Sequence, residues 1–448
     1  MTGEIGRLVR LYWDGTCSPV DVLEDHLAAA EQLNEDLNAF TRFMPDTARA
    51  DALASAQRYA QGRPLSQLDG VPVTVKDLID VQGVPTTAGS MASDPEPARR
   101  DATVVGRLRS QGAIVFGKVN LLEYANGVVH PDFGSARNPW NLDRSSGGSS
   151  SGSGSAVAAG LGFGSVGTDT LGSVRFPAAW CGTVGMKPTR GAIATSGVIP
   201  LSGTLDHVGV LARTVADTRR LFEGLSRDHM PPTGDRPLRI GVVEPPHPAD
   251  REVEEACAAV VQRLPDHACE LVSLPPFPWE DANAAALVIL YSEALEIHQD
   301  RLAARWQGYS EASRGRLLAG AVLSAPDYYR ARLVREVLRA EWAALLRRSA
   351  VDAVVLPTLP VTAPWEGGEA KVRDLGGITL YTGPFAFLGV PAVSLPVALS
   401  ADGMPISLQV CGGEARDGFI LDVAARVEDA RGDWPRPPIF HDPFAAVR

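Results

Sequence analysis

The sequence predicts an α/β fold, and two observations lead to that class. Short apolar runs typical of buried strands alternate along the chain with longer amphipathic stretches typical of helices, which favours a layered α/β architecture. The chain has 448 residues, 45% of them hydrophobic, so it can bury a large core. Length alone permits one large domain or two to three ordinary ones.

The N-terminal part, residues 1–65, is predicted to be helical. Ser18-Pro19 is a strong helix start, because a capping hydroxyl precedes a proline at the first helical position. One face of that helix is then marked at helical spacing by Val22, Leu23, His26, Leu27, Ala30 and Leu33. A second helical pattern covers residues 46–61, and we expect both helices to pack on the surface of the domain.

Strand patterns begin at residue 71. The apolar runs 71–75 and 113–116 predict two strands, and the arginine-bearing stretch 101–111 between them predicts a helix. Further on, Ala156 to Ala159 form helices readily, and the apolar segment from Phe163 to Val166 is expected to be buried.

In the C-terminal half, residues 238–243 predict a strand and residues 251–264 a helix, and the turn-rich segment Pro231 to Pro237 before them is a candidate linker. The Ala-, Leu-, Arg- and Glu-rich region 280–346 predicts two or three helices, interrupted near Ser324 to Pro326, that form a flank or cap. The remaining predicted elements are strands at 351–357, 392–397 and 406–410 and a closing helix at 418–429.

Composition excludes several classes of function. The net charge of −11 argues against a broad nucleic-acid surface, so small molecules are the expected ligands. We find no apolar stretch long enough to span a membrane and no signal-peptide pattern at the N-terminus, which predicts a cytoplasmic protein. The five cysteines have scattered spacings, which indicates neither a disulfide framework nor a zinc site.

Serines and glycines are concentrated in residues 145–177, around Ser149 and Ser173. Glycine lets backbone N–H groups approach a ligand closely, and a serine hydroxyl can be a nucleophile or relay a proton. A flexible Gly/Ser linker is the alternative. The segment runs directly into apolar, helix-forming sequence, so we expect a loop fixed to buried elements.

At this point the chain resembles the amidase signature family of serine hydrolases. The matching motifs, in order, are DGVPVTVKDLIDVQGVPTTAGS (69–90), NPWN (138–141), GGSS (147–150) and GTDTLGSVRFPAAWCGTVGMKPTRG (167–191). The resemblance extends over nearly the whole chain. It implies a single domain over residues 1–448, with a twisted mixed sheet flanked by helices on both faces and a catalytic core at 66–225. It also implies that no metal or organic cofactor takes part.

The same resemblance implies a Ser/Ser/Lys triad: Ser173 as the nucleophile, Ser149 as the bridging serine after a cis peptide bond from Gly148, and Lys76 as the base. The two serines are separated by 24 residues (173 minus 149), the spacing expected of the family. Lys76 follows a buried strand, where desolvation favours the neutral amine that a base requires. The alternative for Lys76 is a structural ion pair with Asp77 or Asp80.

Backbone N–H groups of residues 170–173 are predicted to form an oxyanion hole, with Thr170, Leu171 and Gly172 leading to the nucleophile. Leu171 departs from the family pattern, which usually has glycine there, so we expect it to alter the width of the acyl pocket. Asp169 and Arg175 match positions that we interpret as supports of this loop.

Asn126, Gly127 and Val128 are the candidate substrate-binding residues, because they correspond loosely to a family loop beside the site. The alternative is that these three residues have only a structural role in the loop. The glycine-rich stretch 160–167 lacks the context of a dinucleotide fingerprint, and close packing explains its glycines better.

The predicted function is hydrolysis of small amides, with carbamates or esters as further substrates, by a monomer or homodimer. Leu171, Phe176 and Trp180 near the nucleophile favour an uncharged, aromatic substrate. One alternative is a glutaminase that resembles the A component of glutamyl-tRNA amidotransferase and releases ammonia for a partner. Another is a degenerate member that only binds its ligand.

Overall fold

Eleven strands join into one mixed sheet in the computed structural model, which describes residues 3–226, 237–245, 247–366 and 378–447. The strands follow one another across the sheet in the order β1 (Phe40–Phe43), β3 (Ile114–Val119), β2 (Pro72–Lys76), β6 (Gly164–Asp169), β8 (His207–Ala212), β7 (Val184–Lys187), β12 (Ala392–Leu399), β13 (Pro405–Cys411), β11 (Ala353–Pro357), β9 (Leu238–Val242) and β10 (Cys269–Ser273). β2 lies parallel to both β3 and β6, and β6 pairs antiparallel with β8. The α/β class and the mixed sheet are therefore confirmed.

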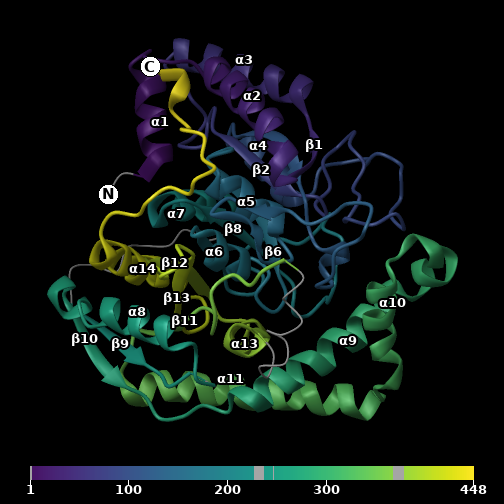
Figure 1. Ribbon diagram of the computed structural model, residues 1–448, viewed down its shortest axis with the longest axis vertical. Helices are drawn as coiled ribbons and strands as arrows, with labels where there is room; N and C mark the ends of the chain where they lie inside the picture. Colours follow the sequence, from purple (N-terminus) through teal and green to yellow (C-terminus); the bar gives the residue numbers. More distant parts are fainter. Residues whose placement is uncertain (1–2, 227–236, 246, 367–377, 448) are drawn as a thin grey trace.

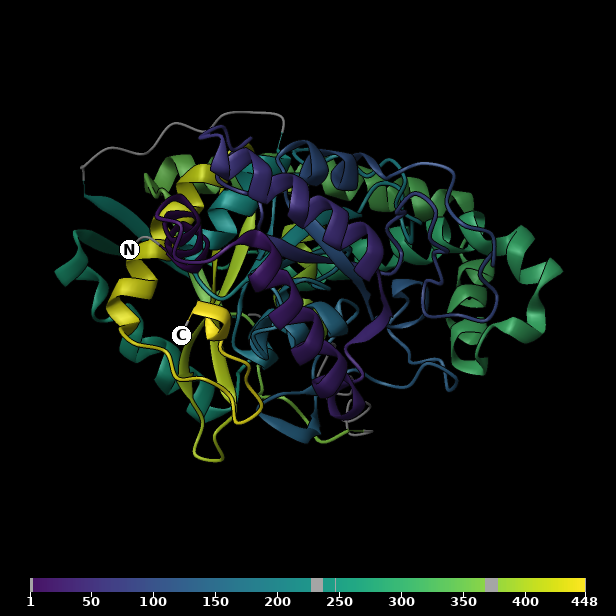
Figure 2. The ribbon, with the colours of Figure 1, turned by 90° about the horizontal axis from the view of Figure 1, so that it is seen from above.

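Helices cover both faces of the sheet, as predicted (Figures 1 and 2). One face packs against α4 (Thr103–Ser110), α7 (Val215–Leu225), α8 (Arg251–Val261) and α14 (Asp417–Arg431). The other packs against α2 (Pro19–Leu37), α3 (Pro45–Ala60), α5 (Ser151–Ala158) and α6 (Arg175–Cys181). Such a sheet needs apolar residues on both sides, and this explains why its inner strands are continuously buried.

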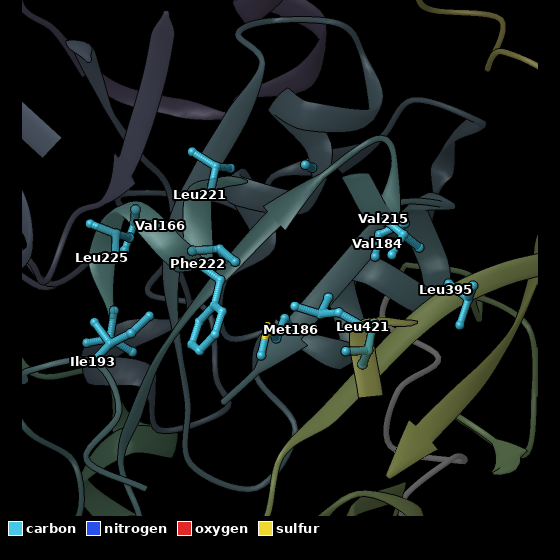
Figure 3. Close-up of a cluster of buried hydrophobic side chains, with 14 of the residues drawn as sticks. Val166, Val184, Met186, Ile193, Val215, Leu221, Phe222, Leu225, Leu395 and Leu421 are labelled. Carbon is cyan, nitrogen blue, oxygen red and sulfur yellow. The ribbon is translucent and has the colours of Figure 1, made fainter. Parts of the chain in front are cut away.

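Apolar side chains from the sheet and from two helices form the core drawn in Figure 3. Strands β6, β7 and β12 contribute Val166, Val184, Met186 and Leu395, and α7 and α14 contribute Val215, Leu221, Phe222, Leu225 and Leu421. All of them are fully buried. The sheet centre is therefore a rigid base for the residues at its strand ends.

Three α-helices lie between β10 and β11 in the sequence, and they run along one side of the molecule (Figure 1). They are α9 (Trp279–Ala304), α10 (Glu311–Leu318) and α11 (Ala325–Ser349). The predicted interruption is present, because Ser324 caps α11 and Pro326 occupies its first turn. We call these three helices the cap.

The C-terminal tail returns to the first helices (Figure 1). Arg436 pairs with Glu4 of α1 (Gly3–Trp13) at 2.7 Å, and His441 pairs with Asp25 of α2 at 2.8 Å. α2 and α3 match the predicted helices and α1 lies in the part predicted to be helical, whereas β1, β7, β8 and α7 were not predicted as elements. The candidate linker, apart from Pro237, lies outside the described residues.

Candidate active site

Lys76 is the last residue of β2 and is fully buried. Its Nζ donates to Ser149 Oγ at 2.8 Å and to Thr168 Oγ1 at 2.9 Å. Desolvation lowers the pKa of Lys76 to about 7, against the opposing charges of Asp206 and Asp169. The alternative of an ion pair with Asp77 is wrong, because Asp77 pairs with Lys118 at 2.6 Å.

Ser149 lies just before α5, and its peptide bond with Gly148 is cis. The glycine is required by space as well, since a Cβ on Gly148 would lie 2.3 Å from Leu122 Cδ1. The next residue links this loop to the other serine: the Ser150 N–H donates to the Ser173 carbonyl at 3.1 Å. Two loops far apart in sequence are thus joined next to Lys76.

Ser173 lies in the turn between β6 and α6 and keeps intermediate exposure, whereas Ser149 and Lys76 are buried. In the described part of the chain, no hydrogen bond joins the hydroxyls of Ser149 and Ser173. Catalytic hydrogen bonds are often completed only when substrate is bound. The hydrogen bond from Lys76 to Ser149 is therefore present, whereas one between Ser149 and Ser173 would require a hydroxyl to turn.

The Ser173 turn is held by Asp169, which accepts from the Gly172 N–H at 2.7 Å and the Val174 N–H at 3.3 Å. Arg175 completes the support with two hydrogen bonds to the same carboxylate, 2.9 and 3.0 Å long. Burial acts to raise the pKa of Asp169, but the Arg175 charge and hydrogen bonds hold it at about 2. Asp169 is thus an anion that orders the turn.

This arrangement leaves fewer N–H donors for the predicted oxyanion hole. The Gly172 N–H is already bound to Asp169, so it is not a free donor. Among the described residues, the N–H groups of Leu171 and Ser173 have no hydrogen-bond acceptor. The Leu171 carbonyl accepts from Thr382 Oγ1 at 2.5 Å, which fixes the orientation of the peptide that follows it.

A cavity of about 640 Å³ opens in front of the two serines. Its walls contain Ser149 and Ser173, the predicted loop Asn126, Gly127 and Val128, and Leu171. The cap closes the other side with Leu287, Leu290, Tyr291, Ala312 and Arg316. The structure therefore brings every predicted site residue together, with Lys76 and Gly172 beside the cavity rather than in its wall.

Residue 127 is a glycine because its φ of +76° is a backbone conformation that L side chains rarely adopt. Arg316 of α10 approaches the same position. Its Nη1 donates to the Asn126 carbonyl at 2.5 Å, and a Cβ on Gly127 would lie 2.1 Å from the same nitrogen. The 126–128 loop is thus held against the cap.

Sequence reasoning missed Thr168 and Asp206. Thr168 anchors the Lys76 amine, and Asp206 accepts from the Thr170 hydroxyl at 2.6 Å. Both contacts depend on strand pairing, since β6 lies between β2 and β8. If β6 had been predicted as a strand, with its register against β2 and β8, both residues would have been found.

The described residues contain one group with metal-ligand geometry, Asp25, His26 and His441, whose ligand atoms lie within 4.8 Å of one another. These residues do not line the cavity, and two of them already pair directly. No helix among the described residues has the length and apolarity needed to cross a membrane.

Comparison with known proteins gives consistent matches. The Amidase family model matches residues 21–421. The chain is 34% identical over 446 residues to AtzE, a component of 1-carboxybiuret hydrolase of Pseudomonas sp. (strain ADP), covering 93% of this chain and 96% of that protein. It is 36% identical over 475 residues to the A component of glutamyl-tRNA(Gln) amidotransferase of Symbiobacterium thermophilum, covering 93% and 94%. The crystal structure of an amidase superimposes with a TM-score of 0.85 at 37% identity, covering 94% of this chain and 98% of that one.

Proposed function

Because the chain belongs to the Amidase family of C–N hydrolases, we propose that it hydrolyses small uncharged amides or carbamates through an acyl-enzyme on Ser173. One observation carries the proposal. The fully buried Lys76 donates to Ser149 Oγ at 2.8 Å. Ser149 and Ser173 both line the same cavity. A base, a relay and an accessible hydroxyl are thus in place around one space of substrate size.

In the first half of the reaction, the neutral Lys76 amine takes the Ser149 proton while Ser149 takes that of Ser173. Ser173 Oγ bonds to the substrate carbonyl carbon, and the carbonyl oxygen becomes an oxyanion. The free N–H groups of Leu171 and Ser173 donate to that oxyanion. Each such donor is typically worth about 3–4 kcal/mol of transition-state stabilisation.

The intermediate then collapses, the C–N bond breaks, and the Lys76 ammonium returns its proton through Ser149 to the leaving nitrogen. Water enters the same place, loses a proton to the relay and attacks the acyl-enzyme. The acid is released and Ser173 regains its proton. Lys76 suits both directions because its pKa of about 7 lets it accept and donate a proton near neutral pH.

The cavity lining supports an uncharged, partly aromatic substrate. Most side chains around the serines are apolar or aromatic, and they include Leu171, Phe176, Trp180, Leu287 and Tyr291. Apolar walls with a few polar groups at one end favour ligands that bury a hydrophobic part. An aryl amide and an aryl carbamate both have this shape.

Two measurements test the function. A fluorophosphonate probe, which needs an activated serine, should label Ser173 alone, and Ser173→Ala should lose both labelling and hydrolysis of an anilide and an aryl carbamate. Ser110→Ala, at an exposed helix end, is the matched control and should behave as the unaltered protein. Turnover by Ser173→Ala contradicts the nucleophile assignment. Failure on both substrates with turnover of a charged amide contradicts the substrate class.

A glutaminase that releases ammonia for a partner is the second candidate, and the similarity to the A component of an amidotransferase favours it. Glutamine hydrolysis that appears only when a second chain co-purifies would support it over a free-standing hydrolase. For the protein alone we propose a monomer or homodimer, to be checked by light scattering after gel filtration.

A further inference from the structure

We propose that Asp206 is a positioning residue of this hydrolase, which fixes Thr170 at the start of the oxyanion turn and supplies the counter-charge for the Lys76 ammonium. The inference rests on the proposed function, because a counter-charge for the Lys76 ammonium matters to the reaction only if Lys76 takes up the serine proton. Nothing in the triad pattern points to residue 206, and its role follows from strand pairing and hydrogen bonds.

The pairing of β6 with β8 brings Asp206 to the active site. Asp169 pairs with His207 in the antiparallel register, so the next residues outward, Thr170 and Asp206, also face each other. Thr170 Oγ1 donates to Asp206 Oδ1 at 2.6 Å. The acid therefore fixes the residue from which the Leu171 to Ser173 turn departs.

Thr170 directly follows β6, two residues beyond Thr168, so in an extended backbone their side chains leave the chain on the same side, about 7 Å apart. Lys76 Nζ binds the first threonine, and the Asp206 carboxylate binds the second. The amine of Lys76 and the carboxylate of Asp206 are thus bound to threonines two residues apart in one segment. The charges of Asp206 and Asp169 are the two that favour the protonated form of Lys76.

The other carboxylate oxygen of Asp206 accepts the N–H groups of Leu201 at 2.8 Å and Ser202 at 3.0 Å. Burial raises the pKa of Asp206 to about 6 against these hydrogen bonds, so the group is an anion at neutral pH. The charge of Asp169 also favours the Lys76 ammonium but has a smaller effect on its pKa than that of Asp206, and Asp169 is paired with Arg175.

The loop 201–206 is also held from the cap side, by Glu293 of α9. Its carboxylate accepts from Ser202 Oγ at 2.5 Å and from the Thr204 N–H at 2.9 Å and Oγ1 at 2.7 Å. Glu293 provides a matched control, since it is a carboxylate that binds the same loop from α9 and is not among the charges that act on Lys76.

The test is the pH dependence of Ser173 labelling by a fluorophosphonate, measured as a second-order rate constant from pH 5 to pH 10. In the unaltered protein the rate should rise with a midpoint near pH 7. Asp206→Asn should move the midpoint down by about one unit, because an opposite charge nearby raises the pKa of an amine by that order. Its plateau should fall by up to about tenfold, since a base that is weaker by one pKa unit removes the serine proton less well.

Variants separate the charge from the hydrogen bond. Asp206→Glu keeps the charge and Thr170→Val removes only the hydrogen bond, so both should keep the midpoint while lowering the plateau. Glu293→Gln should also keep the midpoint. Asp206→Ser, with space for water, is a second neutral variant in case Asp206→Asn does not fold, and melting temperatures identify folded variants.

A folded neutral variant with an unshifted midpoint overturns the role of Asp206 while Ser173 labelling stands. An equal downward shift in Glu293→Gln also overturns it, because the effect is then not specific to Asp206. Labelling that persists in Ser173→Ala contradicts the proposed function itself, and the inference about Asp206 falls with it.

Discussion

Replacing Asp169 by asparagine is expected to destabilise the fold and to disorder the oxyanion turn together. The carboxylate is fully buried and accepts four hydrogen bonds, two from backbone N–H groups of the turn and two from Arg175. Asparagine has nearly the same shape. However, it removes the charge that balances Arg175 and places an N–H₂ group among donors.

The magnitude follows from the burial of both partners. Asp169 and Arg175 are each 0% exposed, so Asp169→Asn leaves a guanidinium in the interior without its counter-charge. Breaking a buried pair in this way costs about 3–5 kcal/mol. For a chain of this length each kcal/mol corresponds to roughly 1 °C in Tm, so the expected loss is about 3–5 °C. The weakened turn should also lower kcat by about a hundredfold or more, as when an oxyanion donor is lost.

Differential scanning calorimetry and fluorophosphonate labelling measure the two effects. Arg175→Gln and the double variant Asp169→Asn/Arg175→Gln complete a cycle, and the double variant should recover part of the Tm because no unpaired charge is left. A change in Tm below 1 °C for Asp169→Asn, or a double variant less stable than the sum of the two single effects, would refute the assignment of Asp169 and Arg175 as a coupled support.

Three further predictions concern the reaction. Only the neutral Lys76 amine can accept the proton. Therefore kcat/KM should rise about tenfold per pH unit below the Lys76 pKa of about 7 and level off above pH 8. A flat profile from pH 5 to 9 contradicts the base assignment. Gly172→Ala should reduce Ser173 labelling by at least about a hundredfold, because the added Cβ would lie 2.4 Å from Thr382 Oγ1, whereas Gly203→Ala, which meets nothing within 4 Å, should not. Leu171→Ala should raise kcat/KM for a bulky acyl group relative to an acetyl group by about tenfold, and an unchanged ratio would remove Leu171 from the acyl pocket.

The triad could be predicted from sequence because its residues lie in local motifs. Lys76 ends a continuous apolar run, and Ser149 and Ser173 lie in glycine-rich turns whose spacing is recognisable. The long amphipathic helices were predictable for a similar reason, since Ser18 and Ser324 both begin capping boxes.

Features that depend on distant pairing were not predictable. β6 is rich in glycine and has no alternating pattern, so it was not recognised as the strand that connects Lys76 to Thr168. The Gly172 N–H is bound to Asp169, and Asp206 accepts a hydrogen bond from Thr170. Both interactions depend on how β6 pairs with its neighbouring strands. The contribution of Tyr291 to the cavity requires a contact over more than a hundred residues, which no local pattern indicates.

The division of the cavity between the sheet and the cap has an evolutionary consequence. The residues that we assign to bond cleavage project from the sheet or from turns adjoining it, whereas Leu287, Leu290, Tyr291, Ala312 and Arg316 of the cavity wall come from the cap helices between β10 and β11. Recognition can therefore diverge by changes in the inserted helices alone, while the chemistry is inherited unaltered. A chimera that receives residues 279–349 from a relative should acquire that relative's substrate preference and retain its own pH profile.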